Sequence, residues 1–278
     1  MGDEAGAGTS TTERLSAALG AVAEALPYLR ATSGPPAEIL RPGEEVADGQ
    51  WFRCDELLGD PAWLRATVAD SGRRLGAPNW TVAASLFVQG YAYRALTVGL
   101  SCFFLGGVLP GSRPEEMAMA LSGGRPALVA YRVPRVVVDG GWRPGNGGRA
   151  KKVLEAFTAD AVEGHMRPLV LATLSCTRVG KRLLWGNVAA SAAVAFRTLE
   201  GLLGSELKPL GERFFQLAPP ELHGLGNFAT VEHTGRSAWY WERRSCCLYD
   251  RLPGKVRCTD CPKISPEERR AAYRAALA

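Results

Sequence analysis

Four cysteines near the end of the sequence have a spacing that could bind metal. Cys246 and Cys247 are adjacent, ten residues separate them from Cys258, and Cys261 lies three positions after Cys258. Thiolates three positions apart can turn toward one centre. Gly254 lets the connection fold back, so that the two cysteine pairs can meet. The pattern therefore predicts a metal or iron–sulfur centre held by all four thiolates.

The adjacent pair bears on which centre this is. Zinc ligands usually come in pairs with about two to four residues between them. In extended backbone, the sulfurs of Cys246 and Cys247 would point to opposite sides, which suits one small tetrahedral ion poorly. A [2Fe–2S] cluster has two irons to ligate, and four thiolates are its standard ligand set. The spacing favours a [2Fe–2S] cluster; a zinc-stabilised binding or interaction protein without redox activity stays the alternative.

Basic residues outnumber acidic residues around these cysteines. The cations are Arg243, Arg244, Arg251, Lys255, Arg257 and Lys263, and the acids are Glu242, Asp250 and Asp260. Cations near a cluster raise its reduction potential, because reduction adds negative charge. The same cations would attract an anionic substrate or an acidic electron donor, although a solvated basic face is the alternative reading.

Six residues are candidates for contact with a substrate. They are Arg243, Arg244, Arg251, Trp239, Trp241 and His165. The alternative role for the tryptophans is packing into the core, and for His165 it is helix capping or packing. In the motif Trp185-Gly186-Asn187, the glycine would permit a close helix contact and Asn187 would bond to backbone, which are structural roles.

The bulk properties restrict the class of protein. The chain has 278 residues, a net charge of +5 and seven cysteines. An odd cysteine count without a signal peptide at the N-terminus argues against a disulfide framework and predicts a cytoplasmic protein. Cys54, Cys102 and Cys176 are isolated and are expected to be small buried hydrophobes.

Several other activities lack their sequence signatures. There is no zinc-finger spacing, RNA-recognition motif or dense basic run, so no nucleic-acid partner is expected. Gly180-Lys181 does not complete a phosphate-binding loop, and the glycines of 140–148 do not match a dinucleotide fingerprint. An external electron donor is therefore implied, which we expect to be a ferredoxin or a flavin reductase.

The elements that must hold the cysteines are predicted to be mainly helical. Helical patterns cover 11–30, 61–76, 149–164, 168–176, 181–203 and 266–277. The apolar stretch 80–109 is interrupted by Arg94 and predicts a buried pair of core helices, with peripheral membrane contact left open. Residues 127–138, divided by Pro134, predict two short strands or a bent edge strand, and Trp239–Trp241 predicts a strand. Phe214, Phe215 and Leu217 fit a short strand or a helix end.

The expected fold class is therefore α+β, a predominantly helical domain with a small β-sheet and a C-terminal cysteine-ligated iron–sulfur segment. Three parts are expected: a disordered tail over 1–10, a mainly helical domain over 11–240, and the iron–sulfur cluster segment over 241–278.

The sequence resembles the FhuF family of siderophore-iron reductases. The resemblance rests on Arg-Arg-Ser-Cys-Cys-Leu-Tyr at 243–249 and Cys-x-x-Cys-Pro at 258–262, supported by 164–169 and 178–187. It covers roughly the last 120 residues. Lys263 departs from the family pattern, which has an apolar residue at this position. The chain also lacks the large nucleotide-binding domain of the distantly similar siderophore synthetases.

This resemblance implies a [2Fe–2S] cluster on Cys246, Cys247, Cys258 and Cys261 and a siderophore-reductase-like helical domain over 11–240. It implies an oxidoreductase that reduces Fe(III) held by a siderophore, typically a hydroxamate, in iron transport and iron homeostasis. Hard oxygen ligands hold Fe(II) far less tightly than Fe(III). One electron passed to the ferric complex would therefore release Fe(II) in the cytoplasm. Under the zinc alternative, the chain would be a zinc-stabilised siderophore-binding or interaction protein without redox activity.

Overall fold

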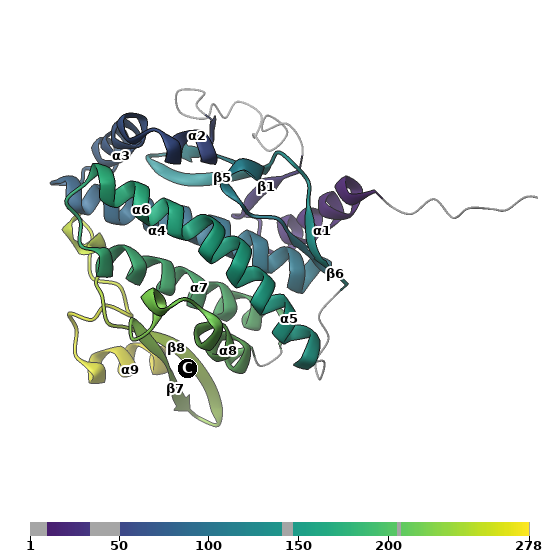
Figure 1. The fold of residues 1–278 in the computed structure, drawn as a ribbon. Helices are drawn as coiled ribbons and strands as arrows, with labels where there is room; N and C mark the ends of the chain where they lie inside the picture. Colours follow the sequence, from purple (N-terminus) through teal and green to yellow (C-terminus); the bar gives the residue numbers. More distant parts are fainter. Residues whose placement is uncertain (1–9, 34–50, 141–146, 205–206, 278) are drawn as a thin grey trace, which may run out of the picture.

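The computed structural model describes residues 10–33, 51–140, 147–204 and 207–277. Residues 1–9 of the predicted tail and the loop predicted at 34–49 lie outside the described residues. The protein is mainly helical with small sheets, as predicted (Figure 1).

Helix α4 (Trp80–Gly106) is the centre of the core. Asn79 caps its first turn by accepting a hydrogen bond from Val82 N at 3.1 Å, and it ends at Gly107 in the left-handed region. Its side chains are buried on nearly all sides, because α1 (Thr11–Ala25), α3 (Pro61–Leu75), α7 (Lys181–Leu203) and strand β5 (Arg125–Tyr131) pack against it.

The prediction of two core helices over 80–109 is wrong: one helix runs to Gly106, and β3 (Val108–Pro110) follows. The glycines within the helix accommodate close neighbours instead of ending it. A Cβ at Gly90 would lie 3.2 Å from Pro126 Cδ, and one at Gly99 would lie 3.4 Å from Phe157 Cε2. None of the helices in the described ranges is long and apolar enough to span a membrane.

Helix α7 has the bounds that the periodicity predicts and packs along α4. On its other side lie α8 (Lys208–Leu217) and the hairpin of β7 (Gly226–His233) and β8 (Arg236–Arg243). The segment of Phe214 and Phe215 is thus helical. Figure 1 shows the hairpin and α9 (Pro266–Ala275) on the opposite side of these helices from β5.

The larger sheet has the strand order β1-β5-β4-β2. Its bounds are β1 (Arg30–Thr32), β2 (Trp51–Arg53), β4 (Met117–Ser122) and β5. Strand β3 pairs separately with β6 (Val136–Asp139). The two strands predicted over 127–138 are therefore present, but β5 is central rather than an edge, because β1 and β4 flank it.

Residues 147–176 form one continuous helical run. It comprises α5 (Gly147–Phe157), a π-helical stretch (Thr158–Met166) and α6 (Arg167–Cys176). Pro168 lies in the first turn of α6, directly after the π-helical stretch. The short helix α2 (Cys54–Gly59) precedes α3, and single 3₁₀ turns occupy Pro114–Glu116, Pro220–Leu222 and Tyr249–Arg251.

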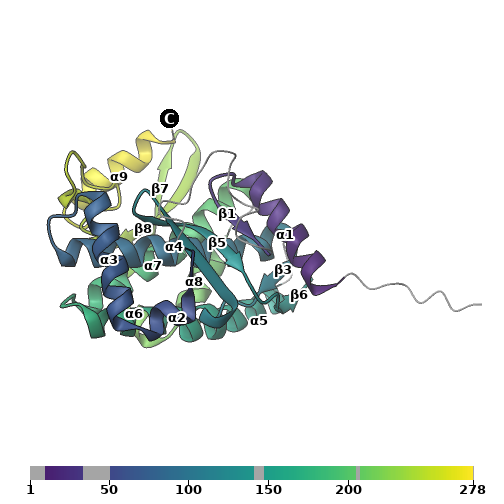
Figure 2. The same cartoon turned by 90° about the horizontal axis from the view of Figure 1, so that it is seen from above.

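The C-terminal segment lies at the end of the molecule formed by α3 and the start of α4. Leu252 packs with Val82 and Leu86 of α4, and Figure 2 shows α9 and α3 at the same end, away from α1. The domain boundary predicted after residue 240 falls inside β8. The division into two domains stays a prediction.

Candidate metal centre

The cysteine segment begins where β8 ends. After Cys246 and Cys247, Leu248 adopts a left-handed backbone with φ of 67°, and a 3₁₀ turn follows. Gly254, also left-handed, reverses the chain toward the second pair, as the sequence predicted. Cys261 N donates to Cys258 O at 3.0 Å, which closes a turn between these two cysteines. These turns therefore bring the four cysteines close together.

The four thiols stand in two pairs, and each pair contains one cysteine from either end of the segment. Cys246 Sγ lies 4.0 Å from Cys261 Sγ, and Cys247 Sγ lies 3.7 Å from Cys258 Sγ. Two sulfurs on one tetrahedral metal are about 3.8 Å apart for bonds of about 2.3 Å. Within the described ranges, no three His, Cys, Asp or Glu side chains are arranged as ligands of one ion. The paired thiols fit a centre with two irons, as in a [2Fe–2S] cluster.

Hydrogen bonds and charges adjust the thiols. Leu248 N donates to Cys246 Sγ at 3.3 Å, a bond that stabilises a thiolate and raises the potential of a bound cluster. Hydrogen bonding from Cys247 lowers the pKa of the Cys258 thiol, although burial opposes this. The pKa values of two other thiols are raised, at Cys246 by hydrogen bonding from Cys247 and by burial and at Cys261 chiefly by burial, so metal binding there would have to release the protons.

Lys263 pairs with Asp250, an acid that lies beside Cys246. Asp250 Oδ1 lies 3.8 Å from Cys246 Sγ, and Lys263 Nζ lies 2.8 Å from Asp250 Oδ2. The Lys263 ammonium lowers the pKa of Asp250, which keeps this carboxylate ionised and paired. The lysine thus offsets a negative charge beside the thiols.

A buried polar network ties the cysteine segment to the two central helices. Arg243 Nη2 donates to Asn187 Oδ1 at 2.8 Å, and Asn187 Nδ2 donates to the Ser85 carbonyl at 2.8 Å. Ser85 Oγ in turn donates to the Cys247 carbonyl at 2.8 Å. Asn187 has no exposed surface and Arg243 is 4% exposed. The backbone of Cys247 is therefore held by α4, and the guanidinium that begins the segment is held by α7.

Gly186 makes room for the same segment. A Cβ at this position would overlap Ser245 Oγ and would lie 2.7 Å from Ser245 Cβ. The close contact predicted for Gly186 exists, but it is with the residue before Cys246 rather than with another helix. Asn187 bonds to backbone, as predicted, and it also accepts from Arg243.

A cavity of about 430 Å³ adjoins the thiols. Cys247 and Cys258, one thiol pair, line it together with residues of α4, α7 and the start of β5. Three arginines also line this cavity, Arg94, Arg125 and Arg243. We call it the cysteine cavity.

The six predicted substrate residues fall in different places. Arg243 lines the cysteine cavity but is buried, and Arg244 and Arg251 are exposed. Trp239 and Trp241 are each 5% exposed and belong to an aromatic cluster with Phe215 and Phe228. The packing expected as their alternative is observed. Contact of any of these residues with a substrate stays a prediction.

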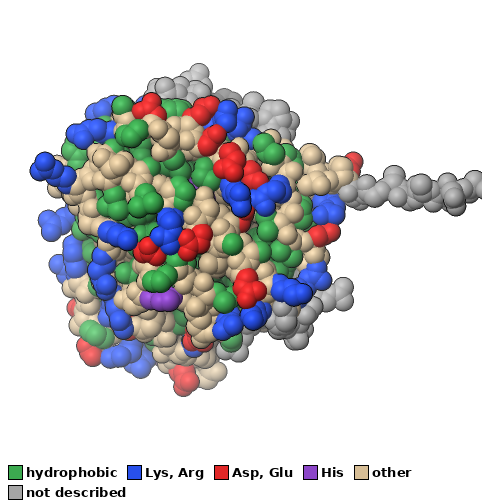
Figure 3. Space-filling model, in the orientation of Figure 1, with side chains coloured by type: hydrophobic (Ala, Val, Ile, Leu, Met, Phe, Trp, Pro, Cys, Tyr) green, Lys and Arg blue, Asp and Glu red, His purple; other side chains and the backbone are tan. Residues whose placement is uncertain are grey.

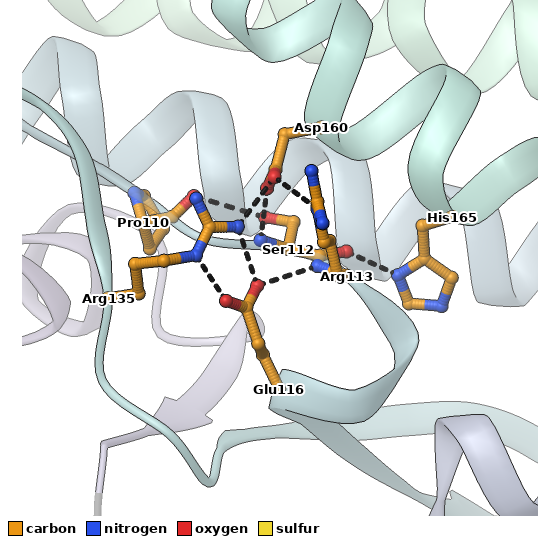
Figure 4. Close-up of polar contacts among 7 residues, drawn as sticks. All are labelled: Pro110, Ser112, Arg113, Glu116, Arg135, Asp160 and His165. Carbon is orange, nitrogen blue, oxygen red and sulfur yellow. Dashed lines mark hydrogen bonds and ion pairs between the residues drawn. The ribbon is translucent and has the colours of Figure 1, made fainter.

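His165 lies apart, in a second polar cluster between the π-helical stretch and the sheet (Figure 4). It is fully buried; Nδ1 lies 2.6 Å from the Ser112 carbonyl and Nε2 lies 2.7 Å from Tyr91 Oη. Beside it, Asp160 and Glu116 pair with Arg135. These contacts give His165 the packing role expected as its alternative.

This histidine should make stability depend on pH. Burial lowers the pKa of His165 to about 4, against the opposing effects of the Ser112 carbonyl, Asp160 and Glu116. The unfolded chain binds a proton near pH 6.5, so stability is complete above that pH and falls toward pH 4, by about 3 kcal/mol. Urea unfolding of the apo-protein at pH 7, 6, 5 and 4 measures this. His165→Gln should flatten the slope, and His223→Gln should not; equal slopes in all three proteins would refute it.

Sequence reasoning missed three residues of the site. Arg94 was noticed only as an interruption of an apolar stretch, and neither Arg125 nor Ser85 was singled out. A lone cation within some thirty mostly apolar residues was a usable signal, because such a charge needs a partner or a cavity. The other two could not be found from the sequence, since they reach the cysteines only through tertiary contacts.

Comparisons with known families agree with this geometry. The profile described as the FhuF 2Fe-2S C-terminal domain matches residues 243–263, which contain all four cysteines. The profile of the ferric iron reductase FhuF-like transporters matches residues 85–236, more than half of the chain. No functionally curated protein matches. The segment is thus a [2Fe–2S] domain, as the spacing favoured, and the zinc alternative loses its support.

Proposed function

Because the chain belongs to the family of ferric iron reductase FhuF-like transporters, we propose that it reduces siderophore-bound Fe(III) by one electron and so releases Fe(II). The substrate class that we propose is a ferric siderophore with hydroxamate ligands. The single observation that carries this proposal is the placement of the paired thiols Cys247 and Cys258 at the wall of a cavity of about 430 Å³. A ferric complex in that cavity would lie beside the ligands of the redox centre.

One electron is enough to free the metal. Hydroxamate oxygens are hard ligands that hold Fe(III) tightly, and Fe(II), with a lower charge, is held much less tightly by the same oxygens. No general acid or base is needed at the iron. The task of the protein is therefore to bind the complex close to an electron source and to let the product leave.

The residues of the site divide this task. A [2Fe–2S] cluster on Cys246, Cys247, Cys258 and Cys261 supplies one-electron redox chemistry when bound. Leu248 N–H and the Lys263–Asp250 pair adjust the charge at the thiols. The Asn187–Arg243–Ser85 network fixes the Cys247 backbone at the cavity wall. A rigid wall limits the reorganisation that electron transfer would otherwise require.

The electron donor that we propose is an acidic ferredoxin or a flavin reductase. Arg244, Arg251, Lys255 and Arg257 are exposed around the cysteine segment. Lys and Arg side chains gather along the left edge of the molecule in Figure 3, on the side where Figure 1 shows the C-terminal segment. Opposite charge on a donor would speed its encounter with this edge.

We propose that the reaction takes place in the cytoplasm. The support is that all seven cysteines are free thiols, which suits a reducing compartment. Roles in iron transport and iron homeostasis follow from the release of Fe(II). Peripheral contact with a membrane face stays a prediction.

The test is anaerobic turnover of the holo-protein with a ferric hydroxamate siderophore, an acidic ferredoxin and its reductase, and a chromophoric trap for Fe(II). We expect the trap to colour at a rate proportional to holo-protein. If Fe(II) forms no faster than with apo-protein, the proposed reaction does not occur.

The donor surface gives a second expected result. Lys255→Glu with Arg257→Glu should slow ferredoxin-driven reduction about tenfold at low salt, because both charges face solvent beside the cysteines. Reduction by dithionite should keep its rate. Arg213→Glu, at an exposed arginine on α8 that bonds Gln216 of the same helix, is the matched control. An equal loss with dithionite would locate the defect in the cluster rather than in docking.

A further inference from the structure

We infer that the cysteine cavity binds the ferric chelate through an anionic group on the chelate, and that Arg94 and Arg125 hold this group. The inference rests on the proposed function and adds a requirement to it, namely that the preferred chelate carries negative charge beyond its iron centre. A ferric tris(hydroxamate) core is neutral, so this charge would come from a substituent such as a carboxylate.

The position of the cavity makes it the place for a substrate. Its walls come from α4 (Gln89, Gly90 and Tyr93), α7, the first residues of β5 and the cysteine segment. A chelate here touches Cys247 and Cys258 without crossing protein. The volume falls in the range of about 300–1,000 Å³ of small-molecule sites. It is large enough for one arm and one face of a chelate.

Arg94 is a half-buried cation that has no acidic partner among the described residues. Burial lowers the pKa of its guanidinium, and its contacts are the Tyr28 carbonyl at 3.3 Å and the ring of Tyr93 at 5.4 Å. In the described part of the chain, no carboxylate pairs with it. A half-buried guanidinium that contacts only a carbonyl and a ring would form a strong, charge-assisted hydrogen bond with a bound anion.

Arg125 lines the same cavity as Arg94 and directly follows a tight turn. Gly123 and Gly124 have φ of 56° and 79°, which makes a tight hairpin turn, and Arg125 is the first residue of β5 after it. Its guanidinium lies over the Tyr249 ring at 5.5 Å, and it too has no carboxylate partner among the residues that the structure describes. Gly90 lets β5 approach α4 here, since Pro126 lies against it.

The charges of the cavity wall leave a surplus of positive charge. The third arginine, Arg243, lies 4.0 Å from Asp260, the one acidic residue that lines the cavity in the described ranges. Arg94 and Arg125 are therefore unneutralised. A cluster with four thiolates is itself negative and would repel an anionic chelate. Two unneutralised guanidiniums offset this repulsion and give the anion two bidentate donors.

Binding can be measured without electron transfer by using Ga(III), which has the charge and nearly the size of Fe(III) but is not reduced. The two probes are Ga(III)-desferrioxamine B, which carries a terminal ammonium, and its N-succinyl derivative, which carries a carboxylate on the same metal core. Calorimetric titration of oxidised holo-protein gives the two Kd values.

We expect the succinyl probe to bind at least about tenfold more tightly than the ammonium probe. Arg94→Gln and Arg125→Gln should each weaken the succinyl probe about tenfold and leave the ammonium probe unchanged or slightly tighter. Arg197→Gln is the matched control, because that arginine also lies over a tyrosine ring, Tyr273, and lines no part of this cavity. It should preserve the preference.

Equal affinity for the two probes, or a preference that survives both arginine substitutions, would overturn the inference. Absence of binding by either probe would overturn it as well. The exposed Arg125 keeps the test independent of folding, and the visible spectrum of each variant reports its cluster. If the Ga(III) probes behave as expected and ferric complexes still fail to oxidise the reduced protein, the inference stands and the proposed function fails.

Discussion

Cys258→Ser should abolish binding of the [2Fe–2S] cluster. This thiol faces Cys247 at 3.7 Å and lines the cysteine cavity, so the serine leaves one pair with a single sulfur. We expect a fall in cluster iron and in visible absorbance of about tenfold or more in protein purified without oxygen. Iron analysis and the visible spectrum measure this directly.

Cys176→Ser is the matched control for this loss. Cys176 is also a free cysteine, 9% exposed, whose sulfur donates to the Thr173 carbonyl in α6. The serine hydroxyl can make the same bond, so iron content should equal that of the wild type. Full cluster content in Cys258→Ser, or equal losses in both variants, would show that the thiol pairs are not the ligands.

Asn187→Leu should destabilise the fold and impair cluster assembly together. Leucine has a similar volume but cannot accept from Arg243 or donate to Ser85, and both partners are buried. Removal of one partner from a buried charged hydrogen bond costs about 3 kcal/mol. We therefore expect the free energy of unfolding in urea to fall by about that amount, with partial cluster content, because Ser85 also holds the Cys247 carbonyl.

Asn227→Leu controls for the loss of an asparagine. Asn227 is exposed on β7 and bonds only Glu242 at 3.2 Å, so its replacement should change the free energy of unfolding by less than about 0.5 kcal/mol. An Asn187→Leu protein with unchanged urea unfolding and full cluster content would mean that the network does not support the cysteines.

The cysteine site was predictable because its information is local. The spacing of Cys246, Cys247, Cys258 and Cys261 predicts that the four cysteines come together, and Gly254 marks the turn that allows it; that all four are ligands stays a prediction. The pairing of the thiols was not predictable. The spacing indicates Cys258 and Cys261 as one pair, whereas in the structure the Sγ atom of Cys246 lies near that of Cys261 and the Sγ atom of Cys247 near that of Cys258.

The helices were predictable where one face is apolar, as in α7. A helix that is buried on nearly all sides, such as α4, was not predictable in this way. Over 80–109, the interruption by Arg94 predicted a pair of helices, but α4 is one helix that keeps its glycines where Pro126 and Phe157 approach closely. Tertiary packing overrides local propensity there. The family match begins at residue 85, well before the segment where motifs are visible to inspection, so α4 belongs to it too.

The cavity required the folded chain. Arg94 on α4, Arg125 on β5 and the cysteines are far apart in sequence, and no spacing rule relates them. The same applies to His165, whose partners Tyr91 and Ser112 come from α4 and the loop after β3. The sequence predicts the chemistry of a site when its residues are near neighbours in the chain. It does not predict a cavity whose wall is assembled from distant elements.

A single-turnover experiment tests the central claim most directly. The holo-protein is reduced with one equivalent of dithionite, freed of reductant, and mixed without oxygen with one equivalent of a ferric hydroxamate siderophore, while visible bands and the EPR signal of the reduced cluster are followed. We predict that the bands return, the EPR signal disappears, and one Fe(II) appears per cluster. Bleached bands and an unchanged EPR signal after mixing would contradict the reduction of siderophore-bound iron by this protein.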